Sequence, residues 1–342
     1  MEKNQLILSV KDLNIKFNLR GKVLHAIRGI DLDIYHGEVL AIVGESGSGK
    51  SVFTKSFMGL LDANGSITSG TIDYYGADDG KPIRLSDLKK EKDWLKVRGH
   101  EIAMIMQDPM TSLNPLKTIG AQIMEAVALH QGLKGAAAKE KTLEYLRDVG
   151  ISDPEKRFKQ YPHEFSSGMR QRVVIAIAVA CSPKILICDE PTTALDVTIQ
   201  AQILQLLKEM RFKYDLTIVM ITHDLGVVAS MCEKIAVMYA GHIVEYGTTD
   251  EIFYQPGHEY TKGLINSIPK LNTAEHERLV PIEGTPVDLL NPPAGCPFAP
   301  RCKNCMKICL SKMPPRTELS DTHYTYCWLQ QKAAFEKGEK AE

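Results

Sequence analysis

The eight residues "GESGSGKS" have the types and spacing of a phosphate-binding loop, G-x-x-x-x-G-K-[ST]. The apolar run before them predicts a buried strand, and helical spacing follows them as far as Leu61. Glycines there let backbone N–H groups curl around phosphate oxygens, and the start of the next helix adds positive partial charge. A Gly/Ser-rich turn is the alternative interpretation. The predicted phosphate-binding residues are Gly44, Glu45, Ser46, Gly47, Ser48, Gly49, Lys50 and Ser51.

Two side chains of this loop and two carboxylates elsewhere could carry out phosphate chemistry. Lys50 would bridge the β- and γ-phosphates, and the Ser51 hydroxyl would ligate Mg²⁺. The apolar stretch "ILICDE" predicts a buried strand that ends in Asp189, a second Mg²⁺ ligand, and Glu190, which would polarise the attacking water. Alone, the carboxylates could simply begin a loop. Kinases and GTPases share the loop, so these residues predict only a nucleoside triphosphate site.

Five of the eight cysteines form a second candidate site, between residues 296 and 327. The longest apolar run has nine residues (173–181), whereas a bilayer span needs about twenty. The N-terminus lacks a signal-peptide core, and the net charge of −1 argues against a nucleic-acid binder. We therefore expect a cytosolic chain, in which clustered cysteines more often bind metal than form disulfides. Core packing is expected for the other three, Cys181, Cys188 and Cys232.

Alternating strands and helices must position these residues. Continuous apolar runs predict buried parallel strands at 38–44, 102–107, 184–190 and 216–224. Helical patterns dominate 118–180, a one-faced helix is expected at 198–214, and a hairpin turns at Ala240-Gly241. The pattern predicts an α/β layered core.

Two regions depart from that core. The charge-rich stretch 78–98 is predicted to be a solvated insertion. From Pro269 onward the chain holds nine of its 17 prolines, which disfavours long helices and sheets. We expect a separate small lobe there that hydrophobic burial alone cannot stabilise.

Four further motifs give a family resemblance. "FSSGMRQR" (165–172) resembles the signature loop, usually L-S-G-G-Q, of ATP-binding-cassette ATPases. "IMQDP", "TTALD" and "ITHD" are similar to the Q-loop, D-loop and switch-histidine motifs of that family, in the family's order. Ser167 replaces the usual glycine of the signature loop, and Met169 the usual glutamine; a positive φ at residue 167 would cost about 1 kcal/mol. The corresponding functional residues are Gln107, Asp196 and His223.

The resemblance implies an α/β P-loop NTPase cassette: a RecA-like core, an antiparallel β subdomain and a helical signature subdomain over about 108–182. It also implies that two cassettes close head to tail around ATP, so that Ser166 and the Gly168 N–H contact ATP on the other subunit. Glu190 would act as base, His223 would hold the γ-phosphate, and Gln107 would join Ser51 and Asp189 around Mg²⁺. Asp196 would lie at the shared site. Phe17 is the candidate for adenine stacking, with His25 second.

Two longer stretches narrow the resemblance. "QDPMTSLNP" (107–115) and "PVDLLNPPAGCPFAPRC" (286–302) resemble ATPase subunits of oligopeptide and dipeptide ABC importers, and nickel importers share part of the pattern. The resemblance implies a cassette domain over 1–266 and an importer-type region over 267–342. It also implies a non-identical partner ATPase, two permease subunits, an extracytoplasmic peptide-binding protein and a peripheral place on the cytoplasmic face of the cell membrane. The net charge of −1 adds the expectation that no nucleic acid is bound.

The resemblance also bears on the cysteine cluster. The family pattern matches Cys296, Cys302, Cys309 and Cys327, and Cys305 is additional. Four thiolates can hold a [4Fe–4S] cluster, which the resemblance favours. Zinc is the second interpretation, kept open by Cys302-x-x-Cys305, and free or redox-active thiols are the third.

Other classes of ABC protein fit less well. A soluble cassette ATPase acting on nucleic acid or ribosomes usually carries two cassettes or a long coiled-coil insertion, and this chain has one phosphate-binding loop and no heptad run. The tail argues against an exporter, by resemblance alone. Lys50, Asp189, Glu190 and His223 together argue against a non-enzymatic regulatory cassette.

Overall fold

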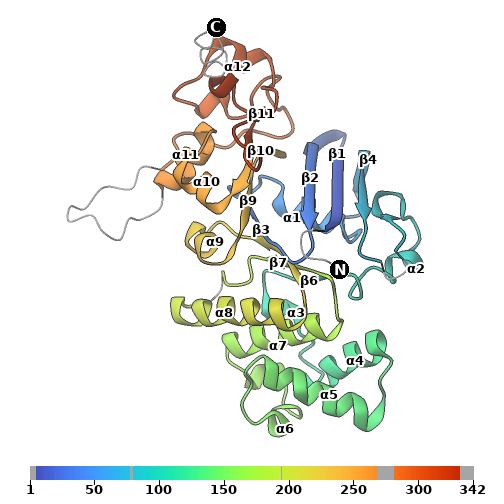
Figure 1. The fold of residues 1–342 in the computed structure, drawn as a ribbon. Helices are drawn as coiled ribbons and strands as arrows, with labels where there is room; N and C mark the ends of the chain where they lie inside the picture. The colour runs from blue at the N-terminus through green and yellow to red at the C-terminus, as the bar shows by residue number, and fades with distance from the viewer. Residues whose placement is uncertain (1–4, 78–79, 194, 268–280, 332–342) are drawn as a thin grey trace, which may run out of the picture.

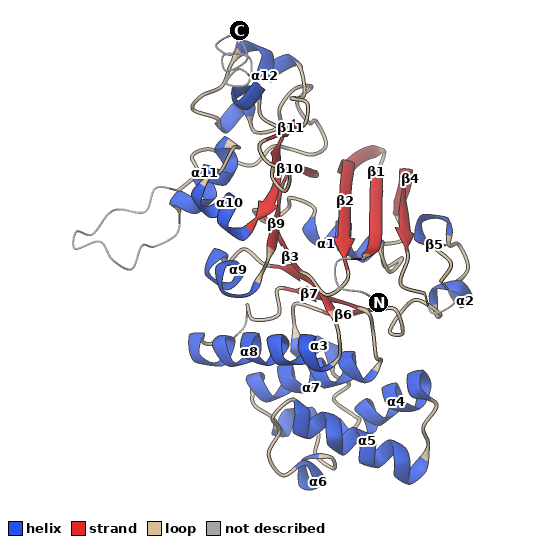
Figure 2. Ribbon diagram, in the orientation of Figure 1, coloured by secondary structure: helices blue, strands red, loops and turns tan. Residues whose placement is uncertain are grey.

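The computed structural model describes residues 5–77, 80–193, 195–267 and 281–331, which form a large central sheet, a small sheet and a group of helices (Figures 1 and 2). The large sheet has the strand order β11-β12-β10-β9-β3-β8-β7-β6. Five of its strands are parallel, and four of them, β3, β6, β7 and β8, confirm the predicted runs. They are β3 (Val39–Val43), β6 (Ile102–Ile105), β7 (Ile185–Asp189), β8 (Thr217–Ile221) and β9 (Lys234–Tyr239).

Each face of this sheet is buried against a different layer. Alternate residues of β3 belong to two separate cores: Ala41 faces one and Ile42 the other. The first core lies beneath the helices α7 (Ser167–Ala180), α8 (Val197–Lys213) and α9 (Leu225–Met231). The second contains Phe53 and Phe57, from and just after α1 (Lys50–Ser56), and the small sheet. Burial on both faces explains why these strands are continuously apolar.

The small antiparallel sheet lies to the right of the large one in Figure 1. Its strand order is β2-β1-β4-β5. The strands are β1 (Leu6–Leu19), β2 (Lys22–Tyr35), β4 (Gly65–Tyr74) and β5 (Ile83–Arg84).

A helical group follows β6 and occupies the lower end of the molecule in Figure 1. The predicted helical region 118–180 is confirmed, with short connections between helices. The Thr118 hydroxyl caps α4 by accepting the Ala121 N–H at 3.3 Å, one of the four donors at a helix start that lack a backbone partner. The group comprises α3 (Pro109–Ser112), α4 (Ile119–Gln131), α5 (Gly135–Asp148), α6 (Pro154–Arg157), η2 (Pro162–Glu164) and α7.

Two predictions of local structure were wrong. The stretch 78–98 is not simply solvated, because Leu85, Trp94 and Val97 are buried; they lie in and next to the short elements η1 (Leu85–Asp87) and α2 (Glu91–Trp94). The helix α1 ends at Ser56, although helical spacing continued to Leu61. Arg98 from the insertion donates to the carbonyls of Met58 and Gly59 at 2.7 and 3.1 Å and so binds acceptors just beyond the helix end.

The C-terminal part of the chain continues the large sheet. The predicted hairpin is confirmed: Ala240 and Gly241 have φ of 49° and 79° and join β9 to β10 (His242–Thr248). After α10 (Thr249–Tyr254) and α11 (Glu259–Asn266), residues 281–331 contain only short elements among those described, as predicted from the prolines. They are η3 (Ala299–Arg301), α12 (Lys307–Ser311), β11 (Thr317–Glu318) and β12 (Tyr324–Thr325), and β12 pairs with β10.

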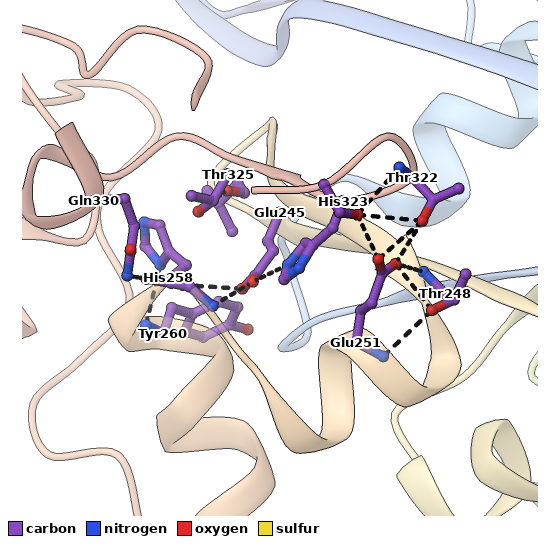
Figure 3. Close-up of polar contacts among 12 residues, drawn as sticks. Glu245, Thr248, Glu251, His258, Tyr260, Thr322, His323, Thr325 and Gln330 are labelled. Carbon is purple, nitrogen blue, oxygen red and sulfur yellow. Dashed lines mark hydrogen bonds and ion pairs between the residues drawn. The ribbon is translucent and has the colours of Figure 1, made fainter. Parts of the chain in front are cut away.

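A polar cluster, buried at Glu245 and His323 and partly exposed at its other members, fastens this segment to the cassette (Figure 3). Glu245 in β10 is fully buried and accepts the N–H of His258 at 3.0 Å, and its other oxygen lies 2.8 Å from His323 Nε2. Beside it, Glu251 accepts from the Thr248 N–H at 2.8 Å and from the Thr322 hydroxyl at 2.8 Å. We call Glu245, Thr248, Glu251, Thr322 and His323 the C-terminal clasp.

Candidate nucleotide-binding site

The phosphate-binding loop lies between β3 and α1, as predicted. Gly47 and Gly49 have φ of 79° and 101°, a left-handed conformation that favours glycine. Lys50 Nζ donates to the carbonyls of Gly44 and Glu45 at 2.8 and 3.0 Å. Burial lowers the pKa of Lys50, although the nearby carboxylates oppose the shift. The ammonium therefore sits within the loop, next to the position where phosphates would bind.

Two of the three predicted Mg²⁺ ligands, Ser51 and Asp189, lie next to each other. Ser51 Oγ donates to Asp189 Oδ1 at 3.1 Å, and Asp189 ends β7 next to the loop. Burial raises the pKa of Asp189, which a cation beside it would offset. Two oxygen ligands from the protein, completed by water and phosphate, fit Mg²⁺. Gln107, the third predicted ligand, directs its amide nitrogen to Glu190 instead.

Glu190 is held by three side chains at the edge of the same pocket. Its Oε2 accepts from Gln107 Nε2 and from Thr193 Oγ1, both at 2.9 Å, and its Oε1 lies 3.2 Å from His223 Nδ1. Its φ of 48° is a left-handed conformation that costs a non-glycine residue energy and is concentrated at functional sites. Thr193, three residues after the carboxylate in the D-loop stretch, was not predicted.

The hydrogen bonds set the charge of Glu190. Burial by itself would raise the pKa of this carboxyl. The bonds from His223 and Thr193 outweigh burial and hold the pKa below its ordinary value. Glu190 is therefore ionised at neutral pH, as a group that orients a water and accepts its proton must be.

The residues predicted to bind phosphate and Mg²⁺ line one pocket together with several apolar side chains. It is lined by loop residues including Lys50 and Ser51, by Gln107, Asp189 and Glu190, and by Phe17, Leu19, Leu24 and Leu289. Phe17 lies at the pocket, as adenine stacking would require, although its side chain is only 8% exposed. His25, the second candidate, does not line it, and its Nε2 lies 3.0 Å from Asn14 Oδ1. Leu289, from the C-terminal segment, was not predicted.

The signature and D-loop residues lie outside this pocket. Ser166 caps α7 by accepting the Met169 N–H at 3.3 Å, and Asp196 caps α8 by accepting the Ile199 N–H at 3.0 Å. Ser167 begins α7 and is absent from the described residues with positive φ, so the strain considered for a non-glycine residue there does not arise. A contact from these residues to ATP would have to be made in another subunit.

The four matching cysteines gather in the C-terminal segment. Cys296, Cys302, Cys309 and Cys327 line one small pocket with His258 and Trp328, whereas Cys305 does not line it. Burial raises the pKa of Cys296 to about 12. Within the described ranges no group of three or more His, Cys, Asp or Glu side chains is placed to hold a metal ion. The four thiols therefore share one pocket without forming a preassembled metal site. Elsewhere, Cys181, Cys188 and Cys232 are buried in the core, as predicted.

Two known protein families match this chain, one over the cassette and one over the C-terminal part. The family described as ABC transporter matches residues 27–193. The family described as the oligopeptide/dipeptide transporter C-terminal region matches residues 244–309.

Individual relatives cover nearly the whole chain. The oligopeptide transport ATP-binding protein AmiE of Streptococcus pneumoniae is 53% identical over 96% of this chain and 90% of its own. The dipeptide transport ATP-binding protein DppD of Bacillus subtilis is 52% identical over 96% of each. OppD of Escherichia coli, an oligopeptide transport ATP-binding protein, is 47% identical over 94% of this chain and 93% of its own.

Solved structures share the cassette fold. CbiO1 of Clostridium perfringens, described as part of the ABC transporter complex CbiONQ, superposes with a TM-score of 0.62 and 31% identity, over 74% of this chain and 92% of its own. The cassette MJ0796, solved as a dimer in a post-hydrolysis state with ADP and phosphate, gives a TM-score of 0.61 and 27% identity, over 71% and 98%. The chain therefore belongs to the ABC transporter family, among the ATP-binding subunits of oligopeptide and dipeptide transporters.

Proposed function

We propose that this chain hydrolyses ATP to drive the import of oligopeptides or dipeptides across a cell membrane. The observation that carries the proposal is the convergence of Gln107, Glu190 and His223 beside a complete phosphate-binding loop. The same chain carries the oligopeptide/dipeptide transporter C-terminal region. Peptide as substrate follows from that region and from the relatives.

Different side chains of the pocket would bind the phosphates, hold Mg²⁺ and activate the attacking water. Lys50 would leave the carbonyls of Gly44 and Glu45 and bind the β- and γ-phosphates. Ser51, Asp189 and Gln107 would hold Mg²⁺, which when bound neutralises phosphate charge. Glu190 would orient the attacking water and take its proton, while His223 would hold the γ-phosphate.

A second cassette would complete the site. We infer that Ser166, the Gly168 N–H and Asp196 act on ATP bound to a non-identical partner ATPase. Ser166 and Asp196 are both exposed at helix starts, where a partner could reach them. The dimeric state of MJ0796, a cassette of the same fold, supports this arrangement. ATP would then close the pair, and hydrolysis would open it.

Membrane subunits would convert that motion into transport. We infer two permease subunits and an extracytoplasmic peptide-binding protein, with this chain peripheral on the cytoplasmic face and no role for nucleic acid. Among the described residues no helix is long and apolar enough to cross a bilayer. Leu116 and Leu129 in the helical group are 86% and 75% exposed and could contact a permease.

The chain would divide near residue 266. We propose a cassette over 1–266, with its helical subdomain at about 108–182, and a Cys/Pro-rich lobe over 267–342. Residues 268–280 and 332–342 lie outside the described part of the chain. We further propose that Cys296, Cys302, Cys309 and Cys327 bind a [4Fe–4S] cluster that ties this lobe together, with zinc as second choice. Their shared pocket, with Cys305 outside it, supports that set of four.

Transport tests the main proposal. The tagged chain, purified with its membrane partners and reconstituted in ATP-loaded vesicles, should accumulate a radiolabelled tripeptide when the binding protein is supplied. Nickel accumulation without peptide accumulation would identify another importer of the family. Co-purification with ribosomes or DNA instead of permeases would identify a soluble cassette ATPase.

Metal analysis tests the cysteine proposal. Anaerobically purified protein should be brown, absorb at about 400 nm and contain iron. Cys302→Ser should lose iron, whereas the matched Cys305→Ser should retain it, because Cys305 lies outside the pocket. A colourless protein with stoichiometric zinc would contradict the iron–sulfur assignment.

A further inference from the structure

Arg301, in the C-terminal segment, lies directly against the phosphate-binding loop. Its Nη1 and Nη2 donate to the two carboxylate oxygens of Glu45 at 2.5 and 3.0 Å. The Arg301 side chain is 3% exposed and that of Glu45 is 26% exposed, so this pair is screened less than a pair on the open surface. The pair joins the residue before Cys302 to the second residue of the loop across 256 positions of sequence.

The geometry requires arginine. Besides Glu45, Arg301 donates from Nη1 to the Tyr239 hydroxyl at 3.4 Å, from Nη2 to the Ile282 carbonyl at 3.1 Å and from Nε to the Glu283 carbonyl at 3.0 Å. These bonds use all five N–H groups of the guanidinium. Lysine has three donors and no planar fork, so it cannot reproduce the set.

Glu45 is also held through its backbone. Its N–H donates to the Tyr260 hydroxyl at 2.8 Å, and its carbonyl accepts from Lys50 Nζ at 3.0 Å. One residue is thus bound to Arg301 through its side chain and to the predicted phosphate-binding lysine through its main chain. The position of the loop is set from the C-terminal segment as well as from the cassette.

The ion pair between Arg301 and Glu45 affects the electrostatic potential where nucleotide phosphates would bind. Glu45 lines a small pocket with Ser46 and Gly47, and both of these residues also line the nucleotide pocket. An unpaired carboxylate at this position would repel the phosphates of ATP. Paired in a fork with Arg301, the carboxylate is neutralised and kept turned toward the C-terminal segment.

We propose that Arg301 is a positioning residue of the nucleotide site, which neutralises Glu45 and fixes the loop that binds the phosphates. The inference rests on the proposed ATP-binding function and makes the C-terminal segment a working part of that site. Leu289, from the same segment, lines the nucleotide pocket and agrees with this role.

A double-mutant cycle on the full chain tests the inference. Affinity for Mg-ATP is measured by isothermal titration calorimetry in the wild type, Arg301→Met, Glu45→Gln and the double variant. Arg301→Met should raise Kd about tenfold when Glu45 is present, but less than about threefold when residue 45 is Gln, because the repelling charge is gone. The matched control is Lys303→Met, which removes a charge from an exposed pair with Glu283 in the same segment. It should leave Kd unchanged.

Each outcome decides a different question. Unchanged affinity in Arg301→Met, or an equal loss with Glu45 and with Gln, would overturn the inference. Failure of the wild type to bind Mg-ATP would overturn the proposed function instead. If thermal melting shows that Arg301→Met does not fold, Arg301→Lys replaces it in the same cycle. That variant keeps the charge but loses the fork, so its affinity should fall less and recover with Glu45→Gln.

Discussion

At the scale of single residues, Glu190 shows how the pocket is prepared for hydrolysis. The carboxylate follows directly after the end of β7, in a left-handed conformation, where residues from three separate stretches of sequence donate to it. Two of these residues, Gln107 and His223, were predicted because each corresponds to the functional residue of a family motif. Thr193 was not, because its hydroxyl is recognisable only once the turn after Glu190 is folded.

The hydrogen bond from Thr193 leads to a prediction about pH. The pKa of Glu190 lies below its usual value, so the ionised base persists as pH falls toward 4.5. Thr193→Val removes one donor to the carboxylate, so the pKa should rise and the acid limb of the pH–rate profile should move to higher pH. Activity at pH 7 should change little.

The profile of phosphate release against pH, from pH 3.5 to 8, checks this prediction, because the acid limb of the wild type lies below pH 4.5. Thr142→Val is the matched control, because it removes a buried hydroxyl in α5, far from the pocket in sequence. An acid limb at the same pH in wild type and Thr193→Val would contradict the role given to this hydrogen bond.

At the scale of elements, the contact between α7 and α8 places the signature loop. Gly168 in the first turn of α7 packs against Ile199 in α8, and a Cβ at residue 168 would lie 2.6 Å from Ile199 Cγ2. The helices themselves were predictable from spacing, and so were the strands, because a sheet buried on both faces needs continuous apolar runs. The end of α1 and the buried part of the insertion were not, since both depend on contacts from Arg98 and Trp94.

Gly168→Ala should therefore destabilise the protein by about 1–3 kcal/mol, because the added methyl group overpacks the contact with α8. The higher helix propensity of alanine, worth about 1 kcal/mol, opposes this loss but is smaller than it. Urea unfolding of the full chain measures the change. The double variant Gly168→Ala with Ile199→Ala should lose less stability than the sum of the two single changes, and strict additivity would contradict the packing argument.

The C-terminal clasp leads to a prediction about stability and pH. Burial would raise the pKa of Glu251, but hydrogen bonds from Ser320, Thr248 and Thr322 lower it from 4.5 to about 2. A carboxyl with a depressed folded-state pKa contributes stability above its unfolded pKa and loses it as pH falls. The clasp should therefore loosen between pH 4.5 and about 2.

Tryptophan fluorescence can follow this loosening. Trp328 lies in the C-terminal segment and reports on the clasp, whereas the other tryptophan, Trp94, lies in the insertion and serves as the reference. In Glu251→Gln the transition between pH 4.5 and 2 should shrink, because the titrating group is absent. An identical transition in that variant would show that another group governs the acid response.

At the scale of the whole molecule, the C-terminal segment is continuous with the cassette. It adds β12 to the large sheet, fastens His323 to the buried Glu245, and brings Arg301 and Leu289 to the nucleotide site. Sequence motifs predicted the two parts and the composition of each. The contacts between them could not be predicted, because residues such as Glu45 and Arg301, 256 positions apart, meet only after folding.

The most direct test of the account is phosphate release from Mg-ATP by the chain purified together with its partner subunits. Glu190→Gln should bind ATP normally but release phosphate at least about 100-fold more slowly than wild type, since general-base catalysis contributes that much or more. Glu209→Gln, an exposed change in α8, should match wild type. Near-normal release by Glu190→Gln would contradict the central claim that this carboxylate, held by Gln107, Thr193 and His223, drives hydrolysis.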